Sequence, residues 1–472
     1  MRLERDSLGE KEVPEEAYYG IQTARALENF PISGINPHPL FVKATVLIKK
    51  AAAEANMTLG VLDPLLGKAI VWAADEVLAG RLQDQFVVDV FQAGAGTSHN
   101  MNVNEVLANR ANELLGGKRG EYHPVHPNDH VNMAQSTNDV FPTAMRLAAI
   151  FLSQGLISTL ESLKKSLDKK SQQFGRVIKS GRTHLQDAVP ITLGQEFGAY
   201  VVTIDKATAL IQGAVESLKE LGIGGTAVGT GLNAHPAYRD EVVQRLSQYT
   251  SWNLRSNPSL IEAMQSMAPF VYLSNNLKLL ALELIRIAND LRLLSSGPRT
   301  GLAEIRLPAV QPGSSIMPGK VNPVIAEVLN MVAFQVVGND FTIALASQAG
   351  QLELNVMMPV IIHNLLSSME ILKNGVRAFQ ERCIEGIEAN EDRCKAYMEK
   401  SLGLATVLNP YIGYERAAQV AKKAFATARS IRDIILEEGL LTPEELDKIF
   451  STTGETDIGS QEKGIRPPTT TP

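Results

Sequence analysis

Leucine and isoleucine recur at alternating steps of four and three residues along residues 273–294, a spacing that is typical of one face of a long helix. The positions are Leu273, Leu277, Leu280, Leu284, Ile287, Leu291 and Leu294. Residues 197–218 repeat it with Phe197, Val201, Ile204, Thr208, Ile211, Val215 and Leu218. Similar patterns cover residues 143–172, 324–348 and 357–380. Five long helices in one region predict a mainly α fold with a central helix bundle.

A second apolar ridge widens the stripe of the helix expected at 273–294. It consists of Leu279, Leu282 and Ile285. A helix that is apolar on more than one side needs more than one partner surface. We therefore expect part of this bundle to be buried against other subunits.

The periodicity also suggests a division into three domains. Residues 1–137 have shorter helical patterns with more Gly and Pro turns, which predicts a mixed, mostly helical N-terminal domain. Residues 138–392 form the predicted bundle domain. Residues 393–472 are more polar and predict a small helical C-terminal domain with a helical pattern at 415–439. In this last domain LTPEELDKIF (441–450) carries a capping box, and the tail SQEKGIRPPTTTP is expected to be disordered.

Composition excludes several classes of function. Apolar residues make up 44% of the 472 positions and charged residues 20%, with a net charge of −6, so no basic surface for nucleic acid is expected. The N-terminus has no apolar signal segment, and no uninterrupted apolar run approaches about 18 residues, so we expect a cytoplasmic protein without a membrane span. Cys383 and Cys394 are expected to be free thiols.

Residues 313–324, GSSIMPGKVNPV, combine two serines, a lysine and an asparagine within a stretch bounded by Gly and Pro. Pro318 and Pro323 prevent a continuous helix, and Gly313 and Gly319 permit unusual backbone angles. An ordinary turn between helices would account for the Gly and Pro residues. A loop with two hydroxyls, one cation and one amide is also suited to closing over a small dianion.

This loop resembles the mobile loop of the aspartase/fumarase superfamily, and further segments match the superfamily in the same order. They are residues 90–106, 126–145, 180–196, 224–233, 289–299 and 350–356. The match runs from about Leu8 to about Phe450. The resemblance implies a three-domain fold of the L-aspartase type with the long-helix bundle at its centre.

The resemblance also implies a set of substrate ligands. Elimination from aspartate removes a weakly acidic proton from Cβ, so the site must stabilise a doubly charged aci-carboxylate with preorganised donors. In the superfamily pattern Thr97, Ser136, Thr137 and Ser315 bind the β-carboxylate, and Asn138 helps to seat the amino group. Taken singly, each of these Ser, Thr and Asn residues would be assigned to helix capping, whereas their joint match favours the substrate site.

The resemblance implies three catalytic residues, Ser314, His184 and Lys320. Ser314 acts as the base once the loop closes, and Lys320 is the nearest cation in sequence that can favour its ionisation. Lys320 and Asn322 are the expected ligands of the α-carboxylate, together with Thr183 and His184, and His184 also orients the amino group. Glu327 is the acid that the family often pairs with this histidine. A carboxylate partner would keep the imidazole cationic more of the time.

Within the superfamily the chain resembles the aspartases, which imply reversible deamination of L-aspartate to fumarate. Class II fumarases, which dehydrate L-malate, are the alternative. Fumarases usually read Ser-Ser-Asn-Asp where this chain has Ser136-Thr137-Asn138-Asp139, and they place an aromatic residue where Leu293 follows Arg292. His99 and Met358 depart from the usual aspartase pattern. A helical scaffold without activity is a third reading, and the intact ligand set argues against it.

Other signals are weak. His123, His126 and His130 cluster without the carboxylate or Cys partners of a metal site, so no metal is expected. The glycine-rich segment 222–231 follows no strand and fails as a dinucleotide fingerprint, whereas the family has a structural turn there. The chain also lacks the Ala-Ser-Gly triplet from which aromatic ammonia-lyases make their electrophile, so no cofactor is expected.

The predicted ligands lie on separate segments at the ends of long helices. A helix of about 25 residues spans nearly 40 Å at 1.5 Å per residue, so these ends cannot easily converge within one chain. The resemblance implies a homotetramer with four sites, each built from three subunits. The expected partners are a small-molecule substrate and other copies of the chain, with no nucleic acid and no membrane.

Overall fold

A computed structural model describes residues 1–452, and the predicted disorder of the C-terminal tail lies outside these residues. The chain divides into two units, and each unit is assembled from several separate segments. Unit 1 comprises residues 1–159, 207–282 and 332–374; unit 2 comprises residues 160–206, 283–331 and the chain from Gly375 onward. The boundaries fall inside five long helices, so each of these helices contributes residues to both units. The three sequence-derived domains stay a prediction.

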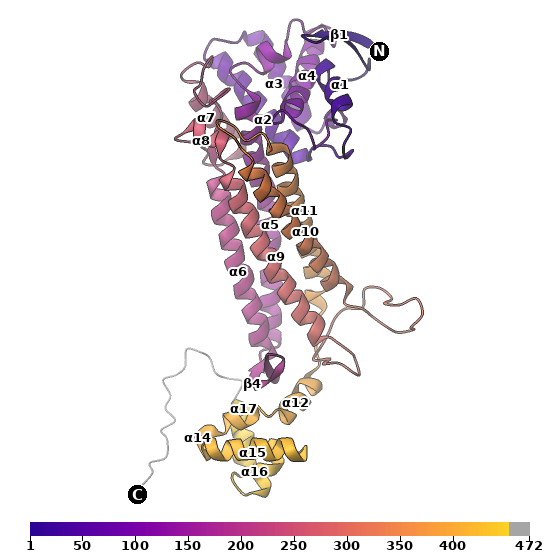
Figure 1. Ribbon diagram of the computed structural model, residues 1–472, viewed down its shortest axis with the longest axis vertical. Helices are drawn as coiled ribbons and strands as arrows, with labels where there is room; N and C mark the ends of the chain where they lie inside the picture. Colours follow the sequence, from indigo (N-terminus) through magenta and orange to yellow (C-terminus); the bar gives the residue numbers. More distant parts are fainter. Residues whose placement is uncertain (453–472) are drawn as a thin grey trace. The chain divides into compact units, whose positions relative to one another are not determined.

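The five long helices match the predicted patterns closely. They are α5 (Thr137–Gln173), α6 (Leu193–Ser217), α9 (Ala268–Leu294), α10 (Val324–Gln348) and α11 (Met358–Arg382). Within each unit their portions lie side by side (Figure 1). All seven members of the predicted seam on α9 are buried. The mainly α fold with a long-helix bundle is therefore confirmed.

Polar contacts between neighbouring helices fix their register within the units. In unit 1, Ser274 on α9 donates to Asp340 on α10 at 2.7 Å. In unit 2, the hydroxyl of Tyr200 on α6 donates to Asp290 on α9 at 3.1 Å. Hydrogen bonds between apolar faces cannot be satisfied in a shifted register, so they select one packing arrangement.

Unit 1 also contains the elements of the N-terminal region and the short elements between α6 and α9. They are β1 (Arg2–Asp6), β2 (Gly9–Val13), α1 (Ile21–Asn29), α2 (Pro39–Thr58), α3 (Pro64–Leu78), η1 (Gln83–Gln85), α4 (Thr97–Leu114), η2 (Pro127–Val131), β5 (Glu220–Leu221), α7 (Tyr238–Thr250), β6 (Arg255–Ser256) and α8 (Leu260–Gln265). Residues of α2, α3 and α4 form one apolar core.

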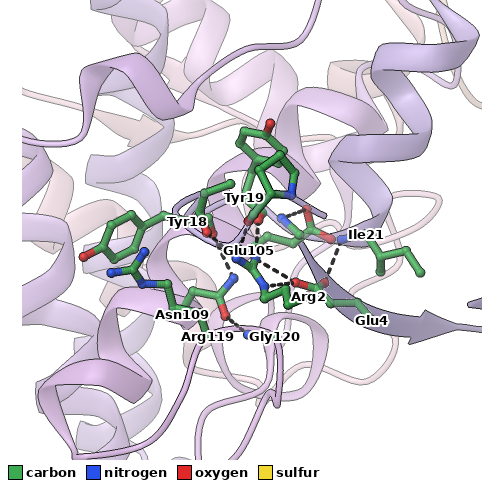
Figure 2. Close-up of polar contacts among 12 residues, drawn as sticks. Arg2, Glu4, Tyr18, Tyr19, Ile21, Glu105, Asn109, Arg119 and Gly120 are labelled. Carbon is green, nitrogen blue, oxygen red and sulfur yellow. Dashed lines mark hydrogen bonds and ion pairs between the residues drawn. The ribbon is translucent and has the colours of Figure 1, made fainter. Parts of the chain in front are cut away.

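Buried carboxylates fasten the N-terminal hairpin to this core (Figure 2). Glu4 accepts from the backbone N–H of Ile21 at 2.8 Å and from the Tyr122 hydroxyl at 2.6 Å. Glu105 on α4 accepts from the backbone N–H groups of Gly20 and Gln22, each at 2.9 Å. Burial raises the pKa of Glu105 to about 7. These contacts hold the start of α1 against α4.

Unit 2 contains the remaining short elements. They are β3 (Ile178–Thr183), β4 (Gln186–Thr192), β7 (Ile305–Arg306), η3 (Ile384–Gly386), β8 (Glu388–Ala389), α12 (Glu391–Lys400), α13 (Leu404–Val407), α14 (Asn409–Ile412), α15 (Tyr414–Thr427), α16 (Ile431–Glu437) and α17 (Pro443–Thr452). The pattern expected as one helix at 415–439 is two helices, because Ala428 adopts a left-handed conformation with φ 53° and Ser430 caps a new helix. The predicted capping box is present: Thr442 and Glu445 each bond the other's backbone N–H, at 3.2 and 2.8 Å.

Both cysteines are buried and free. Burial raises the pKa of each thiol to about 12, so both stay protonated and unreactive at neutral pH.

Two of the long helices, α5 and α10, are apolar and long enough to cross a membrane by length and composition alone. Each helix carries an occasional charged residue, so neither forms the uninterrupted apolar run that the sequence pattern would show for a membrane span. In α5, 78% of the window is buried inside the protein, as expected of a core helix. In α10 only 39% is buried, so this helix leaves apolar surface uncovered.

Candidate active site

In unit 1 two helices begin at predicted ligands: α4 begins at Thr97 and α5 begins at Thr137. Gly94, Ala95 and Gly96 have φ values of 88°, 55° and 93° and turn the chain sharply into α4. The Thr97 hydroxyl donates to the Gly94 carbonyl at 2.7 Å. The unpaired N–H groups and the positive dipole end of a helix favour an anion at such a position.

The two helix starts are neighbours. A Cβ atom on Gly96 would lie 2.1 Å from the ring of Phe141, which is in the first turns of α5. Only glycine allows this approach. The structure therefore brings Thr97 close to the segment that carries Ser136, Thr137 and Asn138.

Residues 136–138 are half-buried and partly occupied with local hydrogen bonds. The backbone N–H of Asn138 donates to the Ser136 hydroxyl oxygen at 3.2 Å. The Asn138 side chain donates to the Ala227 carbonyl at 2.8 Å. Ser136 thus does make a helix-capping contact, and its hydroxyl hydrogen stays available to a ligand.

A buried carboxylate, Asp139, fixes the backbone beneath these ligands. One oxygen accepts from the N–H of Ser136 at 2.9 Å, and the other accepts from Gly224 and Thr226 at 3.1 and 2.9 Å. Burial raises the pKa of Asp139 to about 6 against the effect of these hydrogen bonds. The glycine-rich segment at 222–231 is therefore a structural turn that donates two backbone hydrogen bonds to Asp139.

In unit 2, His184 and Leu185 form the two-residue connection of the β3–β4 hairpin, between the paired residues Thr183 and Gln186. Their φ values are 54° and 59°, a conformation that is uncommon for residues other than glycine. Thr183 and His184 are both exposed. The hairpin thus presents the two predicted ligands at its tip.

A buried glutamate holds the base of this hairpin. Arg182 donates to both oxygens of Glu304, at 3.0 and 2.8 Å, and Lys179 lies 3.2 Å from the same carboxylate. Glu304 is completely buried. A bidentate Arg–carboxylate pair fixes orientation as well as position.

The loop from Gly313 to Asn322 is closed by its own hydrogen bonds. The N–H of Gly313 donates to the Lys320 carbonyl at 2.8 Å, and the Asn322 side chain donates to the Gly313 carbonyl at 2.7 Å. The Ser314 hydroxyl oxygen accepts from the N–H groups of Ile316 and Met317 at 3.2 and 3.0 Å. Two such donors favour negative charge on that oxygen.

Lys320 and Asn322 line a cleft of about 620 Å³ in unit 2, together with Arg292 and Ser296. Ser315 and Lys320 are exposed. Glu327, in the first turn of α10, lies 3.9 Å from Arg292. Within residues 1–452 no hydrogen bond or ion pair joins Glu327 to His184, and their expected pairing stays a prediction.

The predicted ligands therefore fall into three groups: Thr97 with residues 136–138, Thr183 with His184, and the loop. Sequence reasoning missed Asp139 and Glu304 as supports of two of these groups. Asp139 follows the matched Ser-Thr-Asn directly, which was a usable signal, whereas Glu304 has no local signal. The two departures from the aspartase pattern, His99 and Met358, are both buried, and the His99 ring is hydrogen-bonded to the Thr45 hydroxyl at 2.9 Å.

Two of the clustered histidines, His126 and His130, make structural hydrogen bonds around η2. The His126 ring accepts from two backbone N–H groups at the start of η2, and the His130 ring accepts from the N–H of His126 at 2.8 Å. Among residues 1–452 no three His, Cys, Asp or Glu side chains are grouped to hold a metal ion.

Comparison with known families matches residues 9–338 to a family described as Lyase and residues 404–453 to the Fumarase C C-terminus. An aspartate ammonia-lyase from Bacillus sp is 53% identical over 451 residues, 96% of each chain. A class II fumarate hydratase from Thermosynechococcus vestitus is 50% identical over 448 residues, 95% of this chain and 96% of its own.

Solved structures agree with these relatives. A fumarate lyase:delta crystallin from Brucella melitensis bound to cobalt superposes with a TM-score of 0.93 at 50% identity, covering 96% of this chain and 98% of its own. A class II fumarase from Schistosoma mansoni gives a TM-score of 0.91 at 41% identity, covering 95% and 97%. The match spans the bundle and both units. The chain therefore belongs to this family of lyases, and the relatives that it resembles include both aspartate ammonia-lyases and class II fumarate hydratases.

Proposed function

We propose that this enzyme is an aspartate ammonia-lyase, which converts L-aspartate reversibly to fumarate and ammonia. The observation that carries the proposal is the Ser136–Thr137 pair at the start of α5, where class II fumarases usually have two serines. Leu293 after Arg292, in place of an aromatic residue, supports the same choice.

The predicted ligands in unit 1 are suited to binding the β-carboxylate. Loss of the Cβ proton would leave two negative charges on this group, so its ligands must be fixed donors. Thr97 and Thr137 stand at two adjoining helix N-termini, and Ser136 adds a third hydroxyl. We assign these three residues to the aci-carboxylate, with Ser315 as a fourth ligand and Asn138 beside the amino group.

Ser314 is the proposed base. Its oxygen accepts two backbone N–H groups, which would stabilise the alkoxide that takes the Cβ proton. Lys320 and Asn322 are the proposed ligands of the α-carboxylate, with Thr183 and His184. Collapse of the aci-carboxylate then forms the double bond of fumarate while ammonia leaves from Cα, on the face opposite the lost proton. No cofactor enters this scheme.

Dehydration of L-malate by the same machinery is the second candidate, because curated fumarate hydratases are nearly as similar as the aspartate ammonia-lyases. The deciding experiment adds L-aspartate or L-malate to the purified protein and records the ultraviolet absorbance of fumarate. We expect formation of fumarate from L-aspartate and none from L-malate. The reverse preference would make the enzyme a fumarate hydratase. No reaction with either substrate would mean that the protein is a helical scaffold without activity.

We also propose that the active enzyme is a homotetramer, in the cytoplasm, whose sites combine residues of three subunits. Apolar side chains on one face of α10 are 50–66% exposed: Met331, Phe334, Phe341 and Leu345. Such a row on a helix of a soluble enzyme needs a partner surface. The exposed Thr183 and His184 are likewise available to a neighbouring subunit.

Complementation between inactive variants tests the shared site. Ser314→Ala and His184→Ala proteins are each expected to be inactive, and unfolding and refolding them together should produce mixed tetramers. Some sites in these tetramers would contain neither mutation, so activity should return to a substantial fraction of wild type. Each variant refolded alone is the control. A mixture that stays inactive, although mixed tetramers form, would assign Ser314 and His184 of each site to one chain.

A further inference from the structure

A buried lysine on α2 makes no ion pair within residues 1–452. Lys49 is completely buried, and its ammonium donates to the side-chain oxygens of Asn132 at 2.9 Å and Gln135 at 3.0 Å. Within residues 1–452 no carboxylate lies within ion-pairing distance of it. A buried cation that is held only by neutral amides is costly, and proteins rarely retain one without a compensating interaction.

The two amides connect Lys49 to both helix starts of the candidate site. The Asn132 oxygen also accepts from the side chains of Asn100 and Asn104 on α4, each at 3.2 Å. The Asn132 side chain donates to the Gln135 carbonyl at 3.2 Å, and Gln135 directly precedes Ser136. The amide network therefore links the buried lysine to the first turns of α4 and to the residue that precedes Ser136.

We propose that Lys49 is a positioning residue and the buried counter-charge for the carboxylate held by Thr97, Ser136 and Thr137, and that anion binding there is accompanied by uptake of a proton at its amino group. This inference rests on the proposed function, because it names the charge partner of the same carboxylate. The lysine acts through Asn132 and Gln135 and need not touch the substrate.

The electrostatics around Lys49 agree with this role. Burial lowers the pKa of Lys49 to about 7, so its amino group is only about half protonated at neutral pH. A dianion bound near it would raise that pKa and draw in a proton. Protonation in turn favours the anion, so binding should weaken as the pH rises above about 7.

Few other charged groups face this lysine. Asp139 on α5 raises the Lys49 pKa, and His99 on α4 stays neutral because burial lowers its pKa to about 3. The charged groups on adjoining elements are engaged elsewhere: Asp75 of α3 with Lys50, Arg245 of α7 with Glu54, and Asp129 of η2 with His126. Burial also lowers the pKa of His130 in η2.

Calorimetric titration with succinate tests the inference, because succinate has both carboxylates of aspartate but no amino group to eliminate. The heat of binding is compared in HEPES and Tris, whose ionisation heats differ, at pH 7 and pH 8. We expect wild type to take up about half a proton per site at pH 7 and nearly one at pH 8. Binding without proton uptake at pH 8 would overturn the inference.

Lys49→Arg is the matched variant, because arginine keeps a permanent charge at the same position. It should bind succinate with the Lys49 share of proton uptake lost and with an affinity that is nearly constant between pH 6 and pH 8. Lys49→Met should weaken binding more than tenfold at pH 6, where wild type is charged. Unchanged proton uptake in Lys49→Arg would place the proton elsewhere and overturn the inference.

His184→Gln covers the case in which the Lys49 variants fail to fold. Uptake that persists without this imidazole supports Lys49, and uptake that disappears assigns the proton to His184 and overturns the inference. If wild type binds no succinate and forms no fumarate, the proposed function is wrong and the inference is wrong with it. Succinate binding without proton uptake removes the Lys49 role alone.

Discussion

Two groups of predicted ligands, one in each unit, are built in opposite ways. The segment around Thr97 and Ser136–Asn138 is anchored by the buried Asp139, by a glycine-rich turn and by the close contact of Gly96 with Phe141. The loop Gly313–Asn322 is mostly exposed, and the hydrogen bonds that the described residues make to it all come from the segment Gly313–Val324. The segment around Thr97 and Ser136–Asn138 is held by hydrogen bonds and packing with other parts of unit 1. The loop is held mainly by hydrogen bonds between its own residues.

This difference matches the two demands of the proposed elimination. Fixed donors stabilise developing charge without reorganising during the reaction, so they belong on helix ends in a packed core. A base that must meet the substrate in a water-free site has to arrive after the substrate has entered. A loop with few tertiary contacts can move at small cost, because local opening costs least where few contacts are lost.

The largest expected effect comes from removing the base on the loop. Ser314→Ala should lower kcat by at least about 10²–10⁴-fold, the usual effect of losing a general base, while KM for L-aspartate changes little. Steady-state kinetics with L-aspartate measures both constants. Ser315→Ala is the matched comparison: it removes one donor to the aci-carboxylate and leaves the base in place, so it should retain more of kcat than Ser314→Ala does. Retention of more than about a tenth of kcat in Ser314→Ala would place the base elsewhere.

A smaller effect is expected from the cation on the same loop. Lys320→Met should raise KM for L-aspartate by about 10–100-fold, because a hydrogen bond to a charged group contributes about 1.5–3 kcal/mol. Lys320→Arg keeps the charge and should recover part of the loss. The loop makes few contacts with the rest of the protein, so thermal stability should not change. An unchanged KM in Lys320→Met would mean that Lys320 points away from the substrate.

A substitution in the segment before Thr97 should instead lower the free energy of unfolding. Gly96→Ala would place a methyl group 2.1 Å from the Phe141 ring and force a left-handed backbone on alanine. The expected loss is about 2–4 kcal/mol in the free energy of unfolding, measured by denaturant titration.

Gly94→Ala separates steric clash from backbone strain in that experiment. Gly94 has a similar φ of 88°, but the nearest atom to an added Cβ lies at 3.6 Å, an ordinary contact. This control should cost only about 1 kcal/mol. Equal losses in the two variants would mean that the contact between α4 and α5 is not tightly packed.

The long helices could be predicted from sequence because their signal is local and repeated. The seam from Leu273 to Leu294 is buried at every position, and the capping box at Thr442 forms as expected. The break at Ala428 could not be predicted, since a left-handed alanine leaves no mark in the pattern. The β3–β4 hairpin was also missed, because it is short and its connection has no glycine.

The sequence by itself determined the helix bundle, the hydroxyl-bearing segments and the composition of the loop, because each of these depends on residues close together in the chain. Only the tertiary structure decided that Thr97 and Thr137 begin adjoining helices, that Glu304 anchors the hairpin of His184, and that Lys49 is buried while Lys50 pairs with Asp75 at the surface. Two adjacent lysines on α2 look alike in sequence. Their pKa values and roles differ because burial depends on contacts with α4 and the segment before α5, which are more than forty residues away in the chain.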